Sequence, residues 1–163
     1  MAQLTMEFDD HGLIKKFEGS GSVVHAELNK GLQAGAAVME RAVVEHTPVG
    51  ATSMLSQSIT HQLYGGGASL EARVFSNDEP IKVLSVETGR APGKMPPWRP
   101  GSALHTWVVR MVGGDERTAF LIARAIGRRG TRGKWMFRKG FQSGRPQVER
   151  IFDQVVANIA RRL

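Results

Sequence analysis

The longest amphipathic pattern in the chain lies at residues 22–47, SVVHAELNKGLQAGAAVMERAVVEHT. Ser22 is a suitable N-cap, because its hydroxyl can accept a hydrogen bond from an otherwise unpaired N–H. Pro48 and Gly50 follow the stretch and end the pattern. The stretch therefore predicts a long N-terminal helix with one apolar face. The apolar residues recur every three or four positions and are Val24, Leu28, Leu32, Ala36, Met39 and Val43.

Two glycines, Gly31 and Gly35, lie one turn apart within this predicted helix. Each weakens a helix by about 1 kcal/mol relative to alanine. A close approach of another backbone would explain both residues. From sequence alone we slightly favour the other interpretation, in which the helix simply tolerates them.

The chain after this helix has the alternation of β-strands. Residues 56–64 and 70–75 each alternate in polarity, and the glycines at 65–67 lie between them. Two alternating runs around a glycine turn predict a β-hairpin. A further turn at 77–80 precedes Ile81–Glu87, which we predict to be a third strand.

The second half of the chain is interrupted by glycine and proline. Residues 89–101 hold three Gly and four Pro, and we expect a mobile loop there. A helical insertion is predicted at 102–129, as a pair of short helices separated by Gly113-Gly114. A second mobile loop is expected at about 130–144. A C-terminal helix is expected from about Pro146, which suits a first helical turn.

Together these elements predict an α+β fold. A small antiparallel sheet, made of the hairpin plus a further strand, would pack against the long N-terminal helix and the C-terminal helix. The inserted pair of short helices would interrupt this arrangement. We expect a single domain over 1–163, in which residues 1–21 form an N-terminal arm.

The charge is divided unequally along the chain. The formal net charge is +7, but residues 1–89 carry 6 Lys+Arg against 11 Asp+Glu, whereas residues 90–145 carry 13 against 2. Such a chain can bind nucleic acid through its basic part. It can equally dock head to tail on copies of itself, acidic half against basic half.

Composition and motifs give no indication of an enzyme. The chain has no cysteine, and its five histidines lack the spacing of a metal site. No nucleophile elbow or phosphate-binding loop occurs. We therefore expect no catalytic residue, no cofactor and no metal. We also expect no membrane span and no signal peptide, so that the protein is made in the host cytoplasm.

A basic segment at 128–135, RRGTRGKW, supports two interpretations equally. Cations and an interleaved aromatic side chain in a flexible stretch could bind nucleic acid. Alternatively, Trp135 and Phe137 could be anchors in a neighbouring subunit, with arginines around them. Under the first interpretation the DNA-facing residues are Arg124, Arg128, Arg129, Arg132 and Lys134.

Four segments, in this order and spacing, resemble the neck and tail-completion proteins of tailed bacteriophages, which are also called minor tail or head–tail connector proteins. They are residues 45–59, with Thr47-Pro48-Val49 before Leu55; residues 83–90, with Glu87-Thr88-Gly89; residues 94–97, with Pro96-Pro97; and residues 130–141, with Gly130-Thr131 before Phe137. The resemblance spans roughly residues 24–163.

The resemblance implies a structural role in the virion. Such a protein would form a ring, expected to be hexameric, at the head–tail junction or upper tail around the DNA path. Its partners would be copies of itself and head-closure or connector, tail-terminator or tail-tube proteins, with non-specific contact to packaged DNA as a further expectation. The expected subunit-interface residues are Glu87, Arg90, Trp98, Trp135, Phe137 and Arg138. The alternative is a nucleic-acid-binding module that uses residues 124–145.

Overall fold

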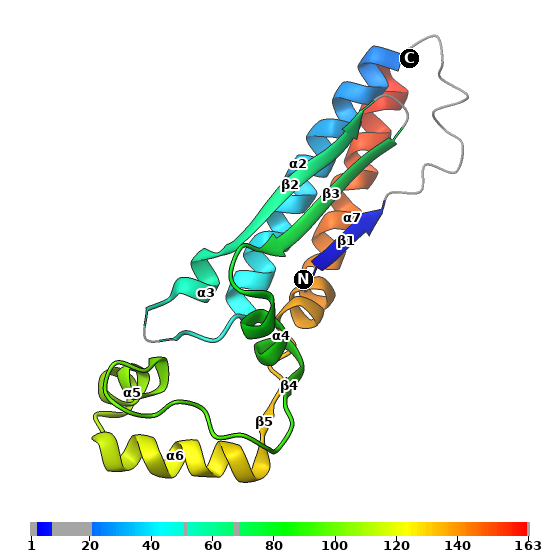
Figure 1. Ribbon diagram of the computed structural model, residues 1–163. Coiled ribbons are helices and arrows are strands. Elements are labelled where there is room, and N and C mark those ends of the chain that lie inside the picture. The colour runs from blue at the N-terminus through cyan, green and yellow to red at the C-terminus, as the bar shows by residue number, and fades with distance from the viewer. Residues whose placement is uncertain (1–2, 8–20, 51, 67–68, 163) are drawn as a thin grey trace.

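The computed structural model describes residues 3–7, 21–50, 52–66 and 69–162. It confirms the predicted class, a mixed fold in which a long N-terminal helix and a C-terminal helix accompany an antiparallel sheet (Figure 1). The elements are β1 (Gln3–Glu7), α2 (Gly21–His46), α3 (Met54–Gln57), β2 (Ile59–Gly66), β3 (Ser69–Ser76), α4 (Pro80–Thr88), β4 (Gly89–Arg90), α5 (Ala103–Trp107), η1 (Val108–Val112), α6 (Glu116–Arg129), β5 (Thr131–Arg132) and α7 (Met136–Arg162).

Helix α2 carries the main apolar face of the protein. All six residues of the predicted stripe are buried, from Val24 to Val43. The helix begins at Gly21, so Ser22 lies inside its first turn. An N-cap precedes the first helical residue, so Ser22 does not have the predicted role. At the other end the hydroxyl of Thr47 donates to the carbonyl of Val43 at 2.7 Å, which satisfies one of the last helical acceptors.

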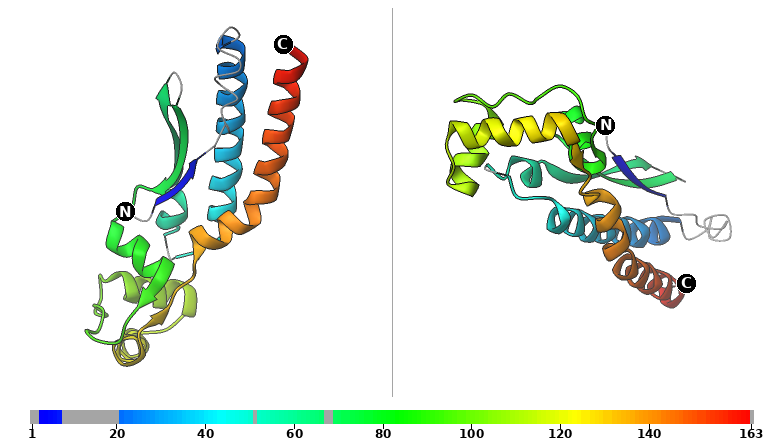
Figure 2. Two further views of the ribbon diagram at one scale, coloured as in Figure 1. Left: turned by 90° about the vertical axis from the view of Figure 1, so that its right-hand side faces the viewer. Right: turned by 90° about the horizontal axis from the view of Figure 1, so that it is seen from below.

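Helix α7 corrects the prediction for the C-terminal part of the chain. It begins at Met136, so the loop expected at 130–144 is largely helical, and Pro146 lies inside the helix instead of in its first turn. A proline inside a helix removes one backbone hydrogen bond. The helix bends along its course, which is a common result of an internal proline (Figure 2). Its first two turns stay helical because Met136, Phe137 and Gly140 are buried in the core.

The two long helices run antiparallel and approach each other closely at glycines (Figure 1). A Cβ at Gly31 would lie 2.6 Å from Cγ2 of Val155, and one at Gly140 would lie 2.7 Å from the Cα of Val43. Gly31 is therefore required by close packing against the Val155 side chain of α7, whereas the backbone contact lies at Gly140.

The sheet has the order β1-β3-β2 and is antiparallel throughout. The predicted hairpin is confirmed by the pairing of β2 with β3, although residues 67–68 of its turn lie outside the described residues. The third strand is β1, from the predicted N-terminal arm, of which residues 1–2 and 8–20 are likewise outside the described part.

The segment Ile81–Glu87, predicted as a strand, is instead helix α4. Pro80 stands at the start of that helix, where its fixed φ suits the first turn. Val83 is buried and Val86 partly so, three positions apart, whereas Ile81 and Leu84 are exposed. A short segment with only four aliphatic residues is compatible with either period, and the helical period is the one that fits the core here.

The sheet lies against α2, and α7 packs on another side of α2 (Figure 2). The largest core cluster joins Met39 and Val43 of α2, Val74 of β3, and Met136 and Phe137 of α7. We call α2, α3, α4, α7 and the three-stranded sheet the body. No helix among the described residues is long and apolar enough to cross a membrane.

Candidate functional site

Residues 91–130, which we call the insertion lobe, project from one end of the body (Figure 1). The lobe is carried on a two-stranded stalk, in which Gly89 pairs with Arg132 and Arg90 with Thr131. Its elements α5, η1 and α6 make their main contacts with one another. The helical insertion predicted at 102–129 is therefore confirmed, and the structure adds that it stands away from the core.

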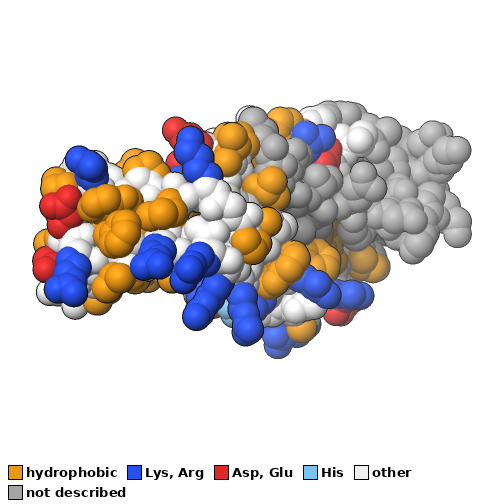
Figure 3. All heavy atoms as spheres, turned by 60° about the horizontal axis from the view of Figure 1, so that its bottom comes forward, with side chains coloured by type: hydrophobic (Ala, Val, Ile, Leu, Met, Phe, Trp, Pro, Cys, Tyr) orange, Lys and Arg blue, Asp and Glu red, His pale blue; other side chains and the backbone are white. Residues whose placement is uncertain are grey.

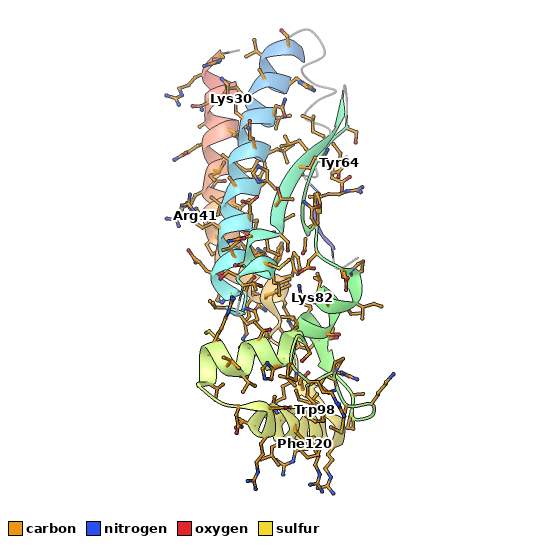
Figure 4. All side chains as sticks on the ribbon, turned by 60° about the vertical axis from the view of Figure 1, so that its left-hand side comes forward. Lys30, Arg41, Tyr64, Lys82, Trp98 and Phe120 are labelled. Atoms are coloured by element: carbon orange, nitrogen blue, oxygen red, sulfur yellow. The ribbon has the colours of Figure 1, made fainter. Side chains whose placement is uncertain are left out.

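The lobe has a small interior of its own. Val108, Ala119 and Ala123 are fully buried there. Trp98 and Phe120 pack edge to face with ring centroids 5.0 Å apart, and Figure 4 shows both in the lobe. The proline-rich segment at 91–101 thus lies along α6 and is held there by contacts with it.

Both helices of the lobe begin at side-chain caps. The hydroxyl of Ser102 accepts from the N–H of His105 at 3.2 Å, and the carboxylate of Asp115 accepts from the N–H of Thr118 at 2.9 Å. The hydrogen bond from the Thr118 N–H holds the pKa of Asp115 below its ordinary value. Asp115 therefore stays ionised at the positive end of α6, where a negative charge stabilises a helix.

Four apolar side chains of the lobe are about half exposed: Val109, Met111, Val112 and Leu121. In an α-helix Met111 would share the face of Val108, three positions earlier, but Val108 is fully buried and Met111 is half exposed. Residues 108–112 form a π-helical turn, whose i→i+5 hydrogen bonds shift the phase of the side chains relative to an α-helix. The apolar residues after Val108 therefore turn away from the lobe interior.

The outer face of α6 is basic. Arg117, Arg124 and Arg128 recur after seven and four residues, which places them on one stripe opposite the buried Ala119 and Ala123. We call these three residues the arginine stripe. Arg129 lies beside it, and all four are exposed. Arg124, Arg128 and Arg129 were predicted to face DNA, whereas Arg117 was missed, although its spacing in the sequence contains the signal.

The junction of stalk and body is organised by Glu87. Its carboxylate accepts from the backbone N–H of Phe137 at 3.0 Å and from that of Arg138 at 3.3 Å, so it caps the start of α7. Its carbonyl accepts from the N–H of Trp135 at 3.0 Å. Glu87 and residues 134–138, which belong to two of the segments that resemble the phage family, therefore meet at this junction.

Trp135 has an unusual conformation for a large side chain. Its φ is 56°, in the left-handed region, and its side chain is 41% exposed. The guanidinium of Arg138 lies 5.8 Å from the ring centroid. A bulky residue in this region costs about 1–3 kcal/mol, so the fold holds an exposed indole in place against a local penalty.

Of the six expected interface residues, four have contacts within their own chain and two are exposed. Phe137, at 5% exposure, is buried in the core of its own chain, so it is not an anchor for a neighbour. Glu87 is a helix cap, Arg90 donates to the carbonyl of Lys94, and Trp98 packs on Phe120. Trp135 and Arg138 remain exposed.

Most acidic groups of the body have partners within the chain. Glu40 is paired with His61, Glu71 with Arg73, and Asp78 with Lys82. The buried Glu27 contacts both Lys30 and Arg162, and its hydrogen bond from Lys30 keeps its pKa below the ordinary value. Among the residues that the structure describes, no carboxylate forms an ion pair with Arg124, Arg128 or Arg129.

Arg132 and Lys134, the other two predicted DNA-facing residues, are exposed on and beside the stalk. Among the described residues, no three His, Asp or Glu side chains gather closely enough to hold a metal ion. Comparisons of the chain with protein-family models, with curated proteins and with solved structures gave no match.

Proposed function

We propose that this chain is a non-enzymatic virion protein of a tailed bacteriophage, which assembles as a ring at the head–tail junction or upper tail around the DNA path. Its neighbours in the virion would be head-closure, tail-terminator or tail-tube proteins. The proposal starts from the four segments that resemble neck and tail-completion proteins.

One observation carries the proposal: the insertion lobe stands on a two-stranded stalk and leaves Val109, Met111 and Val112 about half exposed, away from the arginine stripe. A lobe that packed back on its body would bury those side chains and gain stability. Apolar surface displayed on a projecting element is typical of a contact with another protein. A lobe of this kind is suited to reach an adjacent subunit.

Trp135 supports the same role. A left-handed φ at an exposed tryptophan gives the isolated chain no advantage, whereas tryptophan is enriched at the centres of protein interfaces. We therefore place Trp135, with Arg138 beside it, in the contact between neighbouring subunits.

The proposal is tested by the mass of the assembly. Wild-type protein and the Trp135→Gly variant would be compared by light scattering after size-exclusion chromatography, alone and mixed with the tail-tube or head-closure protein of the same phage. We expect a closed oligomer from the wild type and a monomer from the variant. Glycine adopts φ 56° without strain, so we expect unfolding free energies within about 1 kcal/mol of each other.

The matched control is Val156→Ser, which removes an exposed apolar side chain of similar accessibility from α7. This variant should assemble like the wild type. A wild type that stays monomeric with every neighbour protein would contradict the proposal, as would a Trp135→Gly variant that assembles normally.

A further inference from the structure

We propose that the arginine stripe on α6 binds the phosphate backbone of duplex DNA without sequence preference. The inference rests on the proposed function, since it names the partner of the insertion lobe's outer face. It differs from the expectation drawn from the sequence, which placed DNA contact along 124–145. Much of that range is helix α7, with Met136, Phe137, Gly140 and Gly144 in the core.

The geometry of α6 suits a regular polyanion. At 1.5 Å per residue, Arg117 and Arg128 are about 16 Å apart along the helix, and Arg124 lies between them. Duplex DNA carries one phosphate per strand about every 3.4 Å of its axis, so the stripe spans several phosphates. With the bottom of Figure 1 turned forward, several Lys and Arg side chains follow one another across the surface, and acidic side chains gather at one end of it (Figure 3).

The chemistry of the stripe also favours phosphate. All its cations are arginine, whose planar guanidinium can donate two parallel hydrogen bonds to one phosphate group. Among the described residues no carboxylate forms an ion pair with Arg124 or Arg128, and Arg117 interacts electrostatically with Asp115 at the start of the same helix. Figure 4 shows nitrogen-tipped side chains on this helix that project away from the body.

A second copy of the chain is a poorer partner for the stripe. Head-to-tail docking of acidic on basic surface needs unpaired carboxylates, but Glu27, Glu40, Glu71 and Asp78 are engaged by cations or histidine of their own chain. Glu87 is occupied by the start of α7. Among the described residues of the body, Glu45, Glu79 and Asp153 are exposed without an ion pair, but they lie on α2, before α4 and on α7, so they form no continuous acidic row that matches the stripe.

Duplex DNA is favoured over a single strand because the stripe lacks a stacking platform. Proteins that bind single strands combine cations with exposed aromatic rings. In the lobe, Trp98 and Phe120 pack on each other, and the residue between the arginines of the stripe is the aliphatic Leu121.

The test is the salt dependence of DNA binding by the full chain. Binding to a labelled 30-base-pair duplex would be followed by fluorescence anisotropy between 50 and 200 mM NaCl, for wild type and for the triple variant Arg117→Gln, Arg124→Gln, Arg128→Gln. Loss of three phosphate contacts should flatten the slope of log K against log[salt] by about 2.7. Over this salt range those three contacts account for a change in affinity of about 40-fold.

The matched control removes three exposed arginines from the body, Arg41→Gln, Arg150→Gln and Arg161→Gln, and so has the same net charge as the triple variant. It should keep the wild-type slope. Equal losses in the two variants would overturn the inference, because they would indicate diffuse attraction to net charge. Absence of salt-dependent binding by the wild type would also overturn it.

Two competitors test the choice of partner. If polyglutamate displaces the duplex at equal charge concentration, the partner of the stripe is an acidic protein surface. If a single strand of equal length binds more tightly than the duplex, the site is a stacking site. Either result overturns the inference. Oligomeric mass measured on the same variants separates this inference from the proposed function. If the wild type and the triple variant assemble but the wild type binds no duplex, only the DNA inference is wrong. If the wild type binds DNA in a salt-dependent way but never assembles, only the proposed ring is wrong.

Discussion

At the scale of single residues, the junction between stalk and body depends on Glu87. The helix it caps is 27 residues long, and the first N–H groups of any helix lack partners within it. The Glu87 carboxylate supplies acceptors for two of them and places a negative charge at the positive end of the helix. A residue that the family resemblance assigned to an interface between subunits thus has a defined role inside one chain.

Replacing Glu87 by alanine should therefore lower the free energy of unfolding by about 1 kcal/mol, the usual cost of losing a helix cap. Glu87→Gln keeps an acceptor but loses the charge, so its effect should be smaller. Urea unfolding measures both. Glu79→Ala, which removes an exposed carboxylate without a side-chain cap bond, is the control. A Glu87→Ala effect no larger than that of the control would contradict the assigned role.

Glu27 gives a prediction for pH. It is buried, and the hydrogen bond from Lys30, assisted by Arg162, holds its pKa in the folded chain below the ordinary value of 4.5. A depressed pKa stabilises the fold fully above about pH 4.5, and this contribution is lost as the pH falls through the folded-state value. The stability difference between wild type and Glu27→Gln should therefore shrink between pH 6 and pH 3 in urea titrations. A difference independent of pH would show that the ionised form contributes nothing.

At the scale of elements, the antiparallel pair of α2 and α7 is set by glycines that allow close contact. Near Gly140 the neighbouring atoms are backbone atoms of Val43, which cannot move aside without displacing α2. Near Gly144, one turn later, the nearest atom is the sulfur of Met39, at the flexible end of a side chain. A methyl group at Gly140 would therefore meet backbone, whereas one at Gly144 would meet the Met39 side chain, with Cβ of Ala42 at 3.3 Å.

We expect Gly140→Ala to destabilise the protein by about 2 kcal/mol, because the strain of overpacking exceeds the better helix propensity of alanine. Gly144→Ala should change stability by less than about 1 kcal/mol, since Met39 can adjust. Thermal or urea unfolding of the two variants decides this. Equal stability of both would mean that the helices can separate at little cost.

At the scale of the whole molecule, the body and the insertion lobe have separate interiors. The largest core cluster contains only body residues, whereas Val108, Ala119 and Ala123 are buried inside the lobe. In the stalk Arg90 pairs with Thr131, so the two ends of the insertion already lie side by side where they leave the body.

Replacing residues 91–130 by Asn-Gly, which suits a two-residue hairpin turn, should thus leave a body that unfolds cooperatively. Circular dichroism should show loss of the lobe helices only. The shortened chain should not form the ring or bind DNA, because the half-exposed apolar residues and the arginine stripe are removed. A shortened chain without a cooperative transition would show that the lobe is part of the body's core.

The sequence by itself determined the class of fold, the buried stripe of α2, the β2–β3 hairpin and the existence of the insertion, because each depends on local periodicity and on glycine or proline at its ends. Only the tertiary structure decided that Ile81–Glu87 is a helix, that α7 begins at Met136, and that Phe137 belongs to the core. These outcomes depend on which neighbour covers a short apolar segment, and local pattern does not contain that information. The same holds for the candidate site: the spacing of Arg117, Arg124 and Arg128 is visible in the sequence, but their common exposure on a projecting lobe arises only when the chain folds.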